Sequence, residues 1–282
     1  MFGILKTYRV FSGRKVGSAR LLFYPLAGFC LNRSFQPWLF AADLALVFSG
    51  ILFATALNDY YDHKLENERN ALGESLGDDA SASAAKLKLL IAVPLILPFS
   101  ILYPLWKLGA PPASIAALFA SLALGILYCA PPFRWKGKKL LGILAPPLGL
   151  YLIFLQAAIL SGPLDALGIA YAILLLAFAW HLEFLHLADD ATKKNEIPRM
   201  SAEKAMRAAA AVSAGAAVAG AALTALSPLF AIPAFFWCVR RFAVKRAKEN
   251  GVGKPRLSPF SRIYCVEEFP ITLGLLVMSR AL

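Results

Sequence analysis

A run of polar side chains follows directly on an apolar stretch early in the chain. Residues 37–57 are predominantly apolar, and Asn58, Asp59, Asp62 and Glu66 come next. Asn58, Asp62 and Glu66 recur every four residues, so a helix of 3.6 residues per turn places them along one stripe. Their oxygen atoms suit Mg²⁺, which proteins usually hold through one or two carboxylates together with substrate phosphates. The spacing therefore predicts a metal site where a membrane helix reaches the surface, with Asn58, Asp59, Asp62 and Glu66 as candidate ligands.

A second polar cluster stands at the end of a later apolar stretch. Glu183, His186 and Asp190 lie at positions i, i+3 and i+7, so a helix places them on one face. Ionisable groups in a membrane span are costly and normally face a bundle interior or a water-filled cavity. Glu183 and His186 are therefore candidate site residues, whereas a solvated helix end also explains Asp190. An imidazole suits Zn, Fe or Mn better than Mg²⁺, so His186 is a candidate metal ligand, proton acceptor or hydrogen-bond partner of Asp190.

A third element combines a break in an apolar stretch with two cations. The segment from Tyr128 to Lys136 contains the pair Pro131-Pro132, followed by Arg134. Arg can contact phosphate oxygens through two parallel hydrogen bonds, and Lys contacts them as a point charge. The segment is either an ordinary basic loop or a phosphate-binding loop.

The elements that position these residues are predicted to be membrane-spanning helices. The chain has 282 residues, of which 59% are hydrophobic, and its mean hydropathy is +0.62. An apolar stretch of roughly 17 to 25 residues crosses a bilayer as a helix. The sequence predicts about nine such helices, in residues 18–33, 37–59, 86–105, 111–131, 138–160, 164–188, 204–226, 227–243 and 262–282. The expected fold is an all-α integral membrane bundle, and because no flexible linker divides the chain, residues 1–282 are expected to form a single transmembrane domain.

The distribution of charge argues against nucleic acid as a partner, although the formal net charge is +12. The Lys and Arg residues concentrate in the N-terminal segment and in the loops after the even-numbered apolar stretches. By the positive-inside rule these segments are cytoplasmic, and the C-terminus lies on the opposite side. Membrane lipids are the expected surroundings. The cysteines Cys30, Cys129, Cys238 and Cys265 are scattered singly, which predicts packing roles.

Together the three polar elements resemble the UbiA superfamily of intramembrane prenyltransferases, over most of the chain. Asn58 to Glu66 is similar to the family's first motif, NDxxDxxxD, with Glu66 in the last acidic place. Tyr128 to Lys136 resembles its YxxPPxRxK loop. Residues 183–190 fall where the motif DxxDxxxD belongs, but Glu183 and His186 stand in places usually held by Asp. Arg69-Asn70 replaces the Arg-Pro pair that is common after the first motif.

The resemblance implies a helical bundle in which the two acidic motifs face each other across a central cavity. In the family, Mg²⁺ bridges these motifs to an isoprenyl diphosphate, whose isoprenyl group is transferred to a lipophilic or aromatic acceptor. The resemblance assigns Asp62 and Asp190 to catalysis, and Glu183 and Asp190 to the metal. His186, which stands where the family has Asp, is a further candidate catalytic residue. The residues that the resemblance assigns to the diphosphate are Tyr128, Arg134, Lys136 and Arg69.

Two classes of alternative function remain open on the sequence. Within the same fold, the protein could be a terpene cyclase or another lipid-linked transferase with altered diphosphate handling, because of His186. From another class, it could be a transporter or a non-catalytic lipid-binding protein, but transporter sites usually lie near the membrane midplane on broken helices. Gln156 is a candidate for shaping an acceptor site or for bonding a neighbouring helix, and Glu267 and Glu268 are candidates for the acceptor site or for the interface.

Overall fold

A computed structural model of the chain describes ten segments of backbone. These are residues 11–12, 15–16, 22–31, 36–66, 80–191, 200–225, 227–231, 234–235, 237–238 and 242. Side chains are described at most of these positions, the exceptions being residues 11, 12, 15, 16, 23, 66, 80–90, 189, 190 and 229. Within this part the fold is helical, apart from a two-stranded antiparallel pair, β1 (Phe11–Ser12) and β2 (Lys15–Val16).

The chain divides into two compact units, each described by itself. The first unit comprises Met1–Phe29, Ser34–Lys136 and Leu152–Gly162. The second unit comprises Cys30–Arg33, Gly137–Tyr151 and Pro163–Leu282. The prediction of a single domain stays a prediction.

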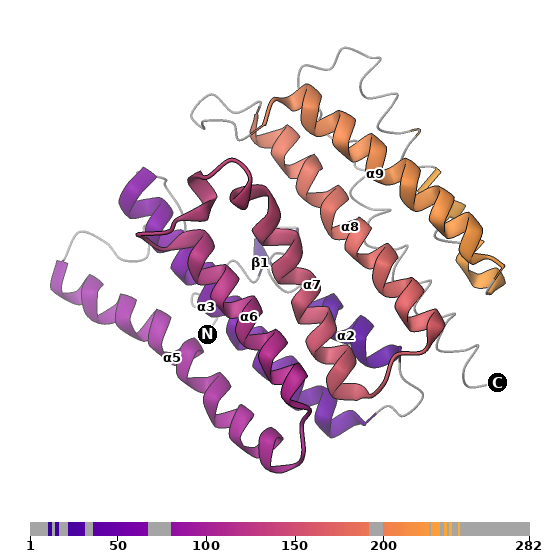
Figure 1. The fold of residues 1–282 in the computed structure, drawn as a ribbon. Coiled ribbons are helices and arrows are strands. Elements are labelled where there is room, and N and C mark those ends of the chain that lie inside the picture. The colour runs from indigo at the N-terminus through magenta and orange to yellow at the C-terminus, as the bar shows by residue number, and fades with distance from the viewer. Residues whose placement is uncertain are drawn as a thin grey trace. The chain divides into compact units, whose positions relative to one another are not determined.

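The first unit is built around α3 (Pro37–Glu66), which packs against α5 (Ala80–Lys107) and α6 (Pro112–Cys129). Figure 1 shows α5 and α6 joined by a short turn. Gly109 in this turn has a φ of +86°, a left-handed conformation that costs glycine nothing. Pro112 then begins α6 at a position where a missing N–H breaks no helical hydrogen bond. The turn therefore reverses the direction of the chain between α5 and α6.

The interior of the first unit is apolar and includes the final residues of α7 (Leu141–Ser161). Its buried members include Phe29, Leu46, Leu118 and Ala157. Gly28 on α2 (Phe23–Cys30) lies against α7: a Cβ atom there would meet the backbone nitrogen of Ala158 at 2.7 Å. The two helix backbones therefore touch, as small residues allow in membrane bundles.

A buried serine on α3 replaces a hydrogen bond that a proline removes from α5. Pro98 has no N–H, so the carbonyl of Pro94 loses its helical partner four residues later. The Oγ of Ser49 on α3 donates a hydrogen bond to this carbonyl oxygen, at 2.9 Å. Because an unpaired buried carbonyl is costly, the bond both satisfies α5 and fixes α3 beside it.

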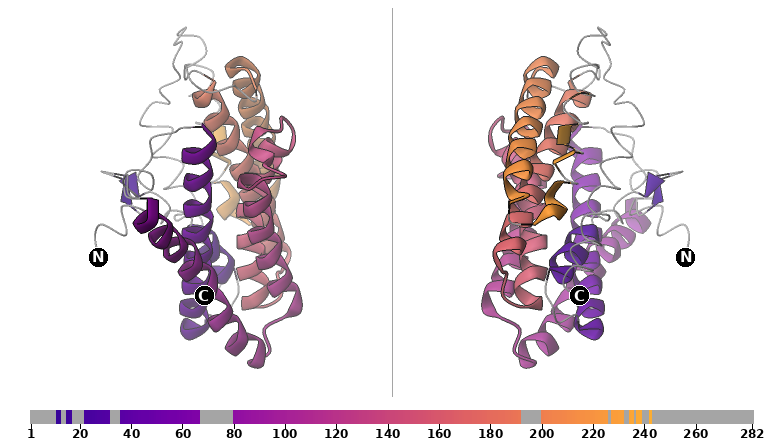
Figure 2. Two further views of the ribbon diagram at one scale, coloured as in Figure 1. Left: turned by 90° about the vertical axis from the view of Figure 1, so that its left-hand side faces the viewer. Right: turned by 90° about the vertical axis from the view of Figure 1, so that its right-hand side faces the viewer.

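The second unit contains α8 (Ala166–Asp190), α9 (Ala202–Leu223) and the short helix η3 (Pro228–Phe230). Helices α8 and α9 stay adjacent in both side views of Figure 2. Ser201 caps α9 by accepting a hydrogen bond from the backbone N–H of Lys204. Nδ1 of the buried His181 on α8 lies 3.1 Å from the carbonyl oxygen of Ala209 on α9. His181 therefore joins the two helices.

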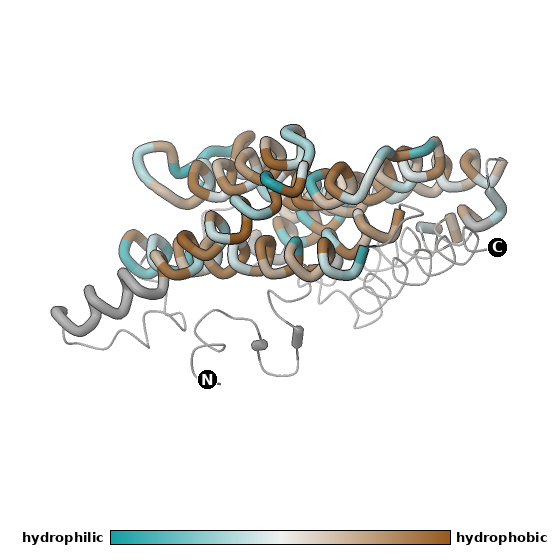
Figure 3. The backbone as a smooth tube through the Cα atoms, turned by 90° about the horizontal axis from the view of Figure 1, so that it is seen from below, coloured by the Kyte–Doolittle hydropathy of each residue, from teal (hydrophilic) through white to brown (hydrophobic). Residues whose placement is uncertain are grey.

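Five described helices are long and apolar enough to cross a membrane, and brown apolar residues recur along the helices in Figure 3. The five segments are Pro37–Leu65, Pro112–Cys129, Leu141–Ser161, Ala166–Ala188 and Ala202–Leu223. Each overlaps one of the predicted stretches, and the shorter apolar helix Ile91–Lys107 overlaps another. The prediction of an all-helical membrane fold is confirmed.

The predicted count of about nine spanning helices is not confirmed. In the stretch 18–33 the structure has α2, which has eight residues and is too short to span. In the stretch 227–243 the longest described helix is η3, with three residues. The stretch 262–282 lies outside the described residues.

Candidate functional site

Three residues from two helices meet at the end of α3. Lys136 Nζ lies 2.6 Å from Asp62 Oδ1, and Asn58 Nδ2 donates a hydrogen bond to Asp62 Oδ2 at 2.7 Å. Asn58 and Asp62 are neighbours because one helical turn separates them. The Asp62 side chain is only 6% exposed, and that of Lys136 is 22% exposed. The site therefore holds a largely buried carboxylate between an amide and an ammonium group.

The backbone after α6 explains how Lys136 reaches Asp62. Helix α6 ends at Cys129, just before Pro131-Pro132. The N–H of Arg134 donates to the carbonyl oxygen of Ala130, and Arg134 has a φ of +35°, in the left-handed region. The chain thereby turns back into η2 (Trp135–Gly137), which carries Lys136. The Tyr128–Lys136 segment is thus an ordered turn whose last cation contacts the first acidic cluster.

Cys129 belongs to this site, which the sequence analysis did not predict. Its Sγ donates a hydrogen bond to Asn58 Oδ1, at 3.4 Å. Asn58 therefore uses its oxygen toward α6 and its nitrogen toward Asp62. The prediction of a purely packing role for Cys129 needs this addition, and the signal in the sequence was its position directly after Tyr128.

The other candidate site residues of the first unit differ in burial and position. Asp59 is buried, with 1% of its surface exposed. Tyr128 lies in the last turn of α6, and both Tyr128 and Arg134 are half-buried. Glu66 is the last residue of α3, but its side chain lies outside the description, and Arg69 lies outside the described residues altogether.

The second polar cluster lies on α8, in the second unit. Glu183 is buried, with 8% exposure, whereas His186 is exposed. The backbone of Asp190 ends α8, and its side chain lies outside the description. The helical placement expected for these three residues is therefore present, but Glu183 and His186 differ in burial.

The donor chemistry at Asp62 is compatible with a cation. Among the side chains that the structure describes, no three or more His, Cys, Asp or Glu residues are grouped to hold a metal ion. Asp62 nevertheless already holds a cation, the ammonium of Lys136, in contact with one carboxylate oxygen. Asn58 and Asp62 supply the oxygen atoms that Mg²⁺ prefers. The oxygen atoms of Asn58 and Asp62 therefore fit a divalent cation in chemical type.

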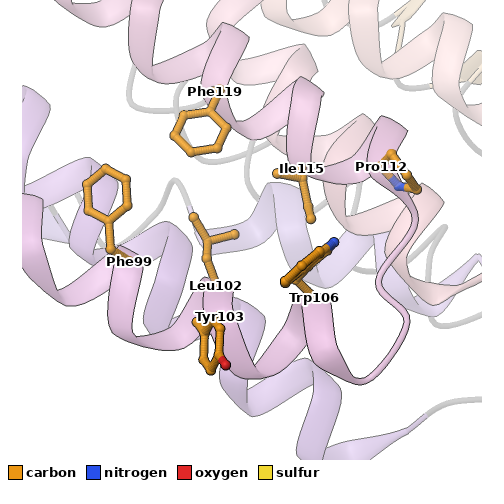
Figure 4. Close-up of a pocket in the computed structure, with 7 residues that line it drawn as sticks. All are labelled: Phe99, Leu102, Tyr103, Trp106, Pro112, Ile115 and Phe119. Atoms are coloured by element: carbon orange, nitrogen blue, oxygen red, sulfur yellow. The ribbon is translucent and has the colours of Figure 1, made fainter.

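A separate apolar groove lies between α5 and α6. It has a volume of about 420 Å³, and Figure 4 shows its aromatic lining. The lining residues are Phe99, Leu102, Tyr103, Trp106, Pro112, Ile115 and Phe119. The lining of the groove contains none of the candidate site residues.

Comparisons with known proteins identify the fold. No protein-family model matches the chain, and no curated protein matches it. The structure is similar to that of a UbiA homologue from Archaeoglobus fulgidus bound to GPP and Mg²⁺, with a TM-score of 0.71, 15% sequence identity, and coverage of 99% of this chain and 98% of that chain. A structure of a UbiA homologue from the same organism bound to DMAPP and Mg²⁺ has the same TM-score and identity, and covers 99% of this chain and 97% of that one. The predicted resemblance is thereby confirmed for the fold: the chain has the fold of the UbiA homologues.

Proposed function

We propose that this protein is a Mg²⁺-dependent intramembrane prenyltransferase, which transfers an isoprenyl group from an isoprenyl diphosphate to a lipophilic or aromatic acceptor. The observation that carries the proposal is the contact of Lys136 with Asp62 beside Asn58. This contact joins the first acidic cluster to the basic loop. The fold is shared with UbiA homologues whose structures contain GPP or DMAPP together with Mg²⁺.

The proposed metal ligands come from both acidic clusters. They are Asn58, Asp59, Asp62, Glu66, Glu183 and Asp190. A diphosphate carries concentrated negative charge, so carboxylates can approach it only with a cation between them. The chemistry that bound Mg²⁺ supplies is neutralisation of the charge that develops on the diphosphate as the allylic C–O bond breaks.

The basic loop binds the diphosphate directly in this proposal. Arg134 contacts its oxygens through the guanidinium fork, and Tyr128 and Arg69 provide further contacts. Lys136 has a double role, because its ammonium neutralises Asp62 in the structure and lies within reach of whatever binds there. With a divalent cation at Asp62, Lys136 would donate hydrogen bonds to the leaving diphosphate.

The remaining steps concern the isoprenyl tail and the acceptor. The apolar side chains of the helices house the tail and keep water from the allylic cation. His186 accepts, at an imidazole nitrogen, the proton that the acceptor loses as it bonds to the isoprenyl group. We also propose that the N-terminus and the Lys136 loop lie on the cytoplasmic side, following the distribution of Lys and Arg.

The decisive experiment measures diphosphate release by the purified full-length protein. DMAPP, GPP and longer isoprenyl diphosphates are supplied with and without Mg²⁺, together with a panel of lipophilic and aromatic acceptors, and the organic products are identified by mass spectrometry. We expect release that requires both Mg²⁺ and an acceptor. Release without acceptor, with a cyclic hydrocarbon or alcohol as product, supports a cyclase instead. Absence of release with every donor contradicts the proposal.

A matched pair of variants ties this activity to the site. Asp62→Asn keeps the shape of the buried side chain, so it should abolish release while the protein remains folded in detergent, and Asp62→Ala should abolish release as well. Glu203→Gln on α9 is the control, since Glu203 is an exposed acid that pairs with Arg207. Near-normal turnover by a well-folded Asp62→Ala protein would overturn the assignment of the metal site.

A further inference from the structure

A second buried polar cluster joins three helices of the first unit, away from the candidate site. It consists of Asp43 on α3, Ser114 on α6 and Gln156 on α7. Their side chains are 0%, 2% and 2% exposed, respectively. All three belong to candidate membrane spans. Burying polar groups in a membrane span costs free energy unless each of them has a hydrogen-bond partner.

The amide of Gln156 lies at the centre of this cluster. Its Nε2 donates to Asp43 Oδ1 at 2.6 Å and approaches Ser114 Oγ at 3.4 Å. Ser114 Oγ donates in turn to the backbone carbonyl oxygen of Gln156, at 2.9 Å. Two buried acceptors are left over: within the described part of the chain, neither Asp43 Oδ2 nor Gln156 Oε1 has a hydrogen-bond partner.

A negative charge on Asp43 does not fit this environment. The structure records no ion pair for Asp43 among the described residues, and its neighbour Gln156 is neutral. A buried carboxylate without a cation or several donors pays a large desolvation cost, which binding a proton removes. The same proton supplies the donor that is missing.

We infer that Asp43 is protonated and forms a cyclic carboxylic acid–amide pair with Gln156. The Oδ2–H group of Asp43 donates to Gln156 Oε1, while Gln156 Nε2 donates to Asp43 Oδ1. Both leftover acceptors are then satisfied by a single proton. The second N–H of the amide points to Ser114, so the donors and acceptors of the cluster are matched.

Exchanging the amide oxygen and nitrogen of Gln156 leads to the same protonation state. In that orientation Gln156 Oε1 lies 2.6 Å from Asp43 Oδ1, and two acceptor oxygens at this distance require a proton between them. Hydrogen bonds between oxygens typically span 2.5–3.0 Å, whereas those from N–H groups span about 2.7–3.2 Å. The 2.6 Å contact lies in the range of bonds between oxygens, and in this exchanged orientation it holds the proton.

The pair fixes the register of the helices that carry the candidate site. Gln156 links Asp43 on α3 to Ser114 on α6, and Cys129 links the same two helices at Asn58. The interval from 43 to 58 equals that from 114 to 129, about 22 Å along each helix at 1.5 Å per residue. Helices α3 and α6 thus run parallel, and hydrogen bonds join them at two positions along their length.

Infrared spectroscopy of the purified full-length protein tests the inference without any substrate. A protonated carboxylic acid has a C=O stretching band at higher wavenumber than the bands of a carboxylate. We expect Asp43→Asn to lose intensity in the protonated-acid region relative to wild type, and to keep the thermal stability of wild type, because Asn can form the same two hydrogen bonds with Gln156. The matched control is Asp165→Asn, which removes an exposed carboxylate in the turn before α8 and should lose carboxylate intensity instead.

Two results would overturn the inference. One is loss of carboxylate intensity in Asp43→Asn with the protonated-acid region unchanged. The other uses Gln156→Leu, in which Asp43 itself is retained. If the pair exists, removing its acceptor shifts the Asp43 acid band to higher wavenumber, and an unshifted band excludes the pair even where Asp43→Asn does not fold.

Discussion

The ammonium nitrogen of Lys136 lies 2.6 Å from Oδ1 of Asp62, although 74 positions separate the two residues in the chain. Asn58 binds the other oxygen of the same carboxylate. The buried carboxylate is thus compensated from two sides, by a neutral donor on its own helix and by a cation from another. A charge that is compensated in this way can exchange one cation for another without becoming an unpaired buried charge.

The first prediction concerns Lys136, whose proposed role is to contact both Asp62 and the diphosphate. Lys136→Met keeps the aliphatic stem and removes the charge. We expect kcat/KM for the isoprenyl diphosphate to fall by about 10²-fold, the typical cost of losing one charge-stabilising donor. Lys138→Met is the control, since Lys138 is exposed two residues later. Equal kinetics for the two variants would show that the loop acts only through its general charge.

The second prediction contrasts two residues of α8. Glu183 is buried and His186 is exposed. We expect His186→Asp to lose roughly 10²–10⁴-fold in turnover at every metal concentration, because it removes the proposed proton acceptor. Glu183→Gln should instead raise the Mg²⁺ concentration that turnover requires, because it removes a proposed oxygen ligand. Turnover is measured over titrations of Mg²⁺ and Mn²⁺. Wild-type turnover with an unchanged metal preference in His186→Asp would contradict the role of His186 as a proton acceptor.

The third prediction tests the repair of α5 by Ser49. Ser49→Ala leaves the carbonyl oxygen of Pro94 without its donor and should destabilise the protein by about 1–3 kcal/mol. Pro98→Ala restores a helical N–H to that carbonyl. In the Pro98→Ala background, Ser49→Ala should therefore cost much less. A double-mutant cycle of thermal unfolding in detergent measures the coupling, and additive effects would mean that the two groups do not share this bond.

The fourth prediction concerns the contact between α2 and α7. Gly28→Ala places a Cβ atom 2.7 Å from the backbone nitrogen of Ala158. Since neither backbone can move independently of its helix, we expect a loss of stability of about 1–3 kcal/mol from overpacking. Gly215→Ala on α9 is the control, because nothing lies within 4 Å of the added atom. Similar unfolding temperatures for the two variants would contradict the close approach of α2 and α7.

The fifth prediction concerns orientation in the membrane. Leu108 and Lys138 are exposed and flank opposite ends of α6, which is long enough to span. We expect Lys138→Cys to react with a membrane-impermeant thiol reagent only from the cytoplasmic side, and Leu108→Cys only from the other side. Labelling above the background of the native cysteines is the readout. Reaction of both positions from one side would show that α6 does not cross.

The sequence alone determined the features that depend on near neighbours and on composition. Apolar length placed the five spanning helices, because a helix must be that long to cross hydrocarbon. Helical periodicity made Asn58 and Asp62 neighbours. The pair Pro131-Pro132 predicted that the helix ends within the Tyr128–Lys136 segment. These conclusions need no knowledge of which helix packs against which.

Only the tertiary structure decided which polar groups from different helices meet. It paired Asp62 with Lys136, Asn58 with Cys129, and Asp43 with Gln156 across 113 positions. Apolar helices offer many similar faces, and lipid is as apolar as the core, so hydropathy does not specify a partner. The choice follows from side-chain packing, small residues such as Gly28, and the need to satisfy each buried polar group. For this reason nothing in the sequence indicated that Asp43 has a polar partner. The structure also decided between the two roles considered for Gln156, because its amide binds Asp43 on a neighbouring helix.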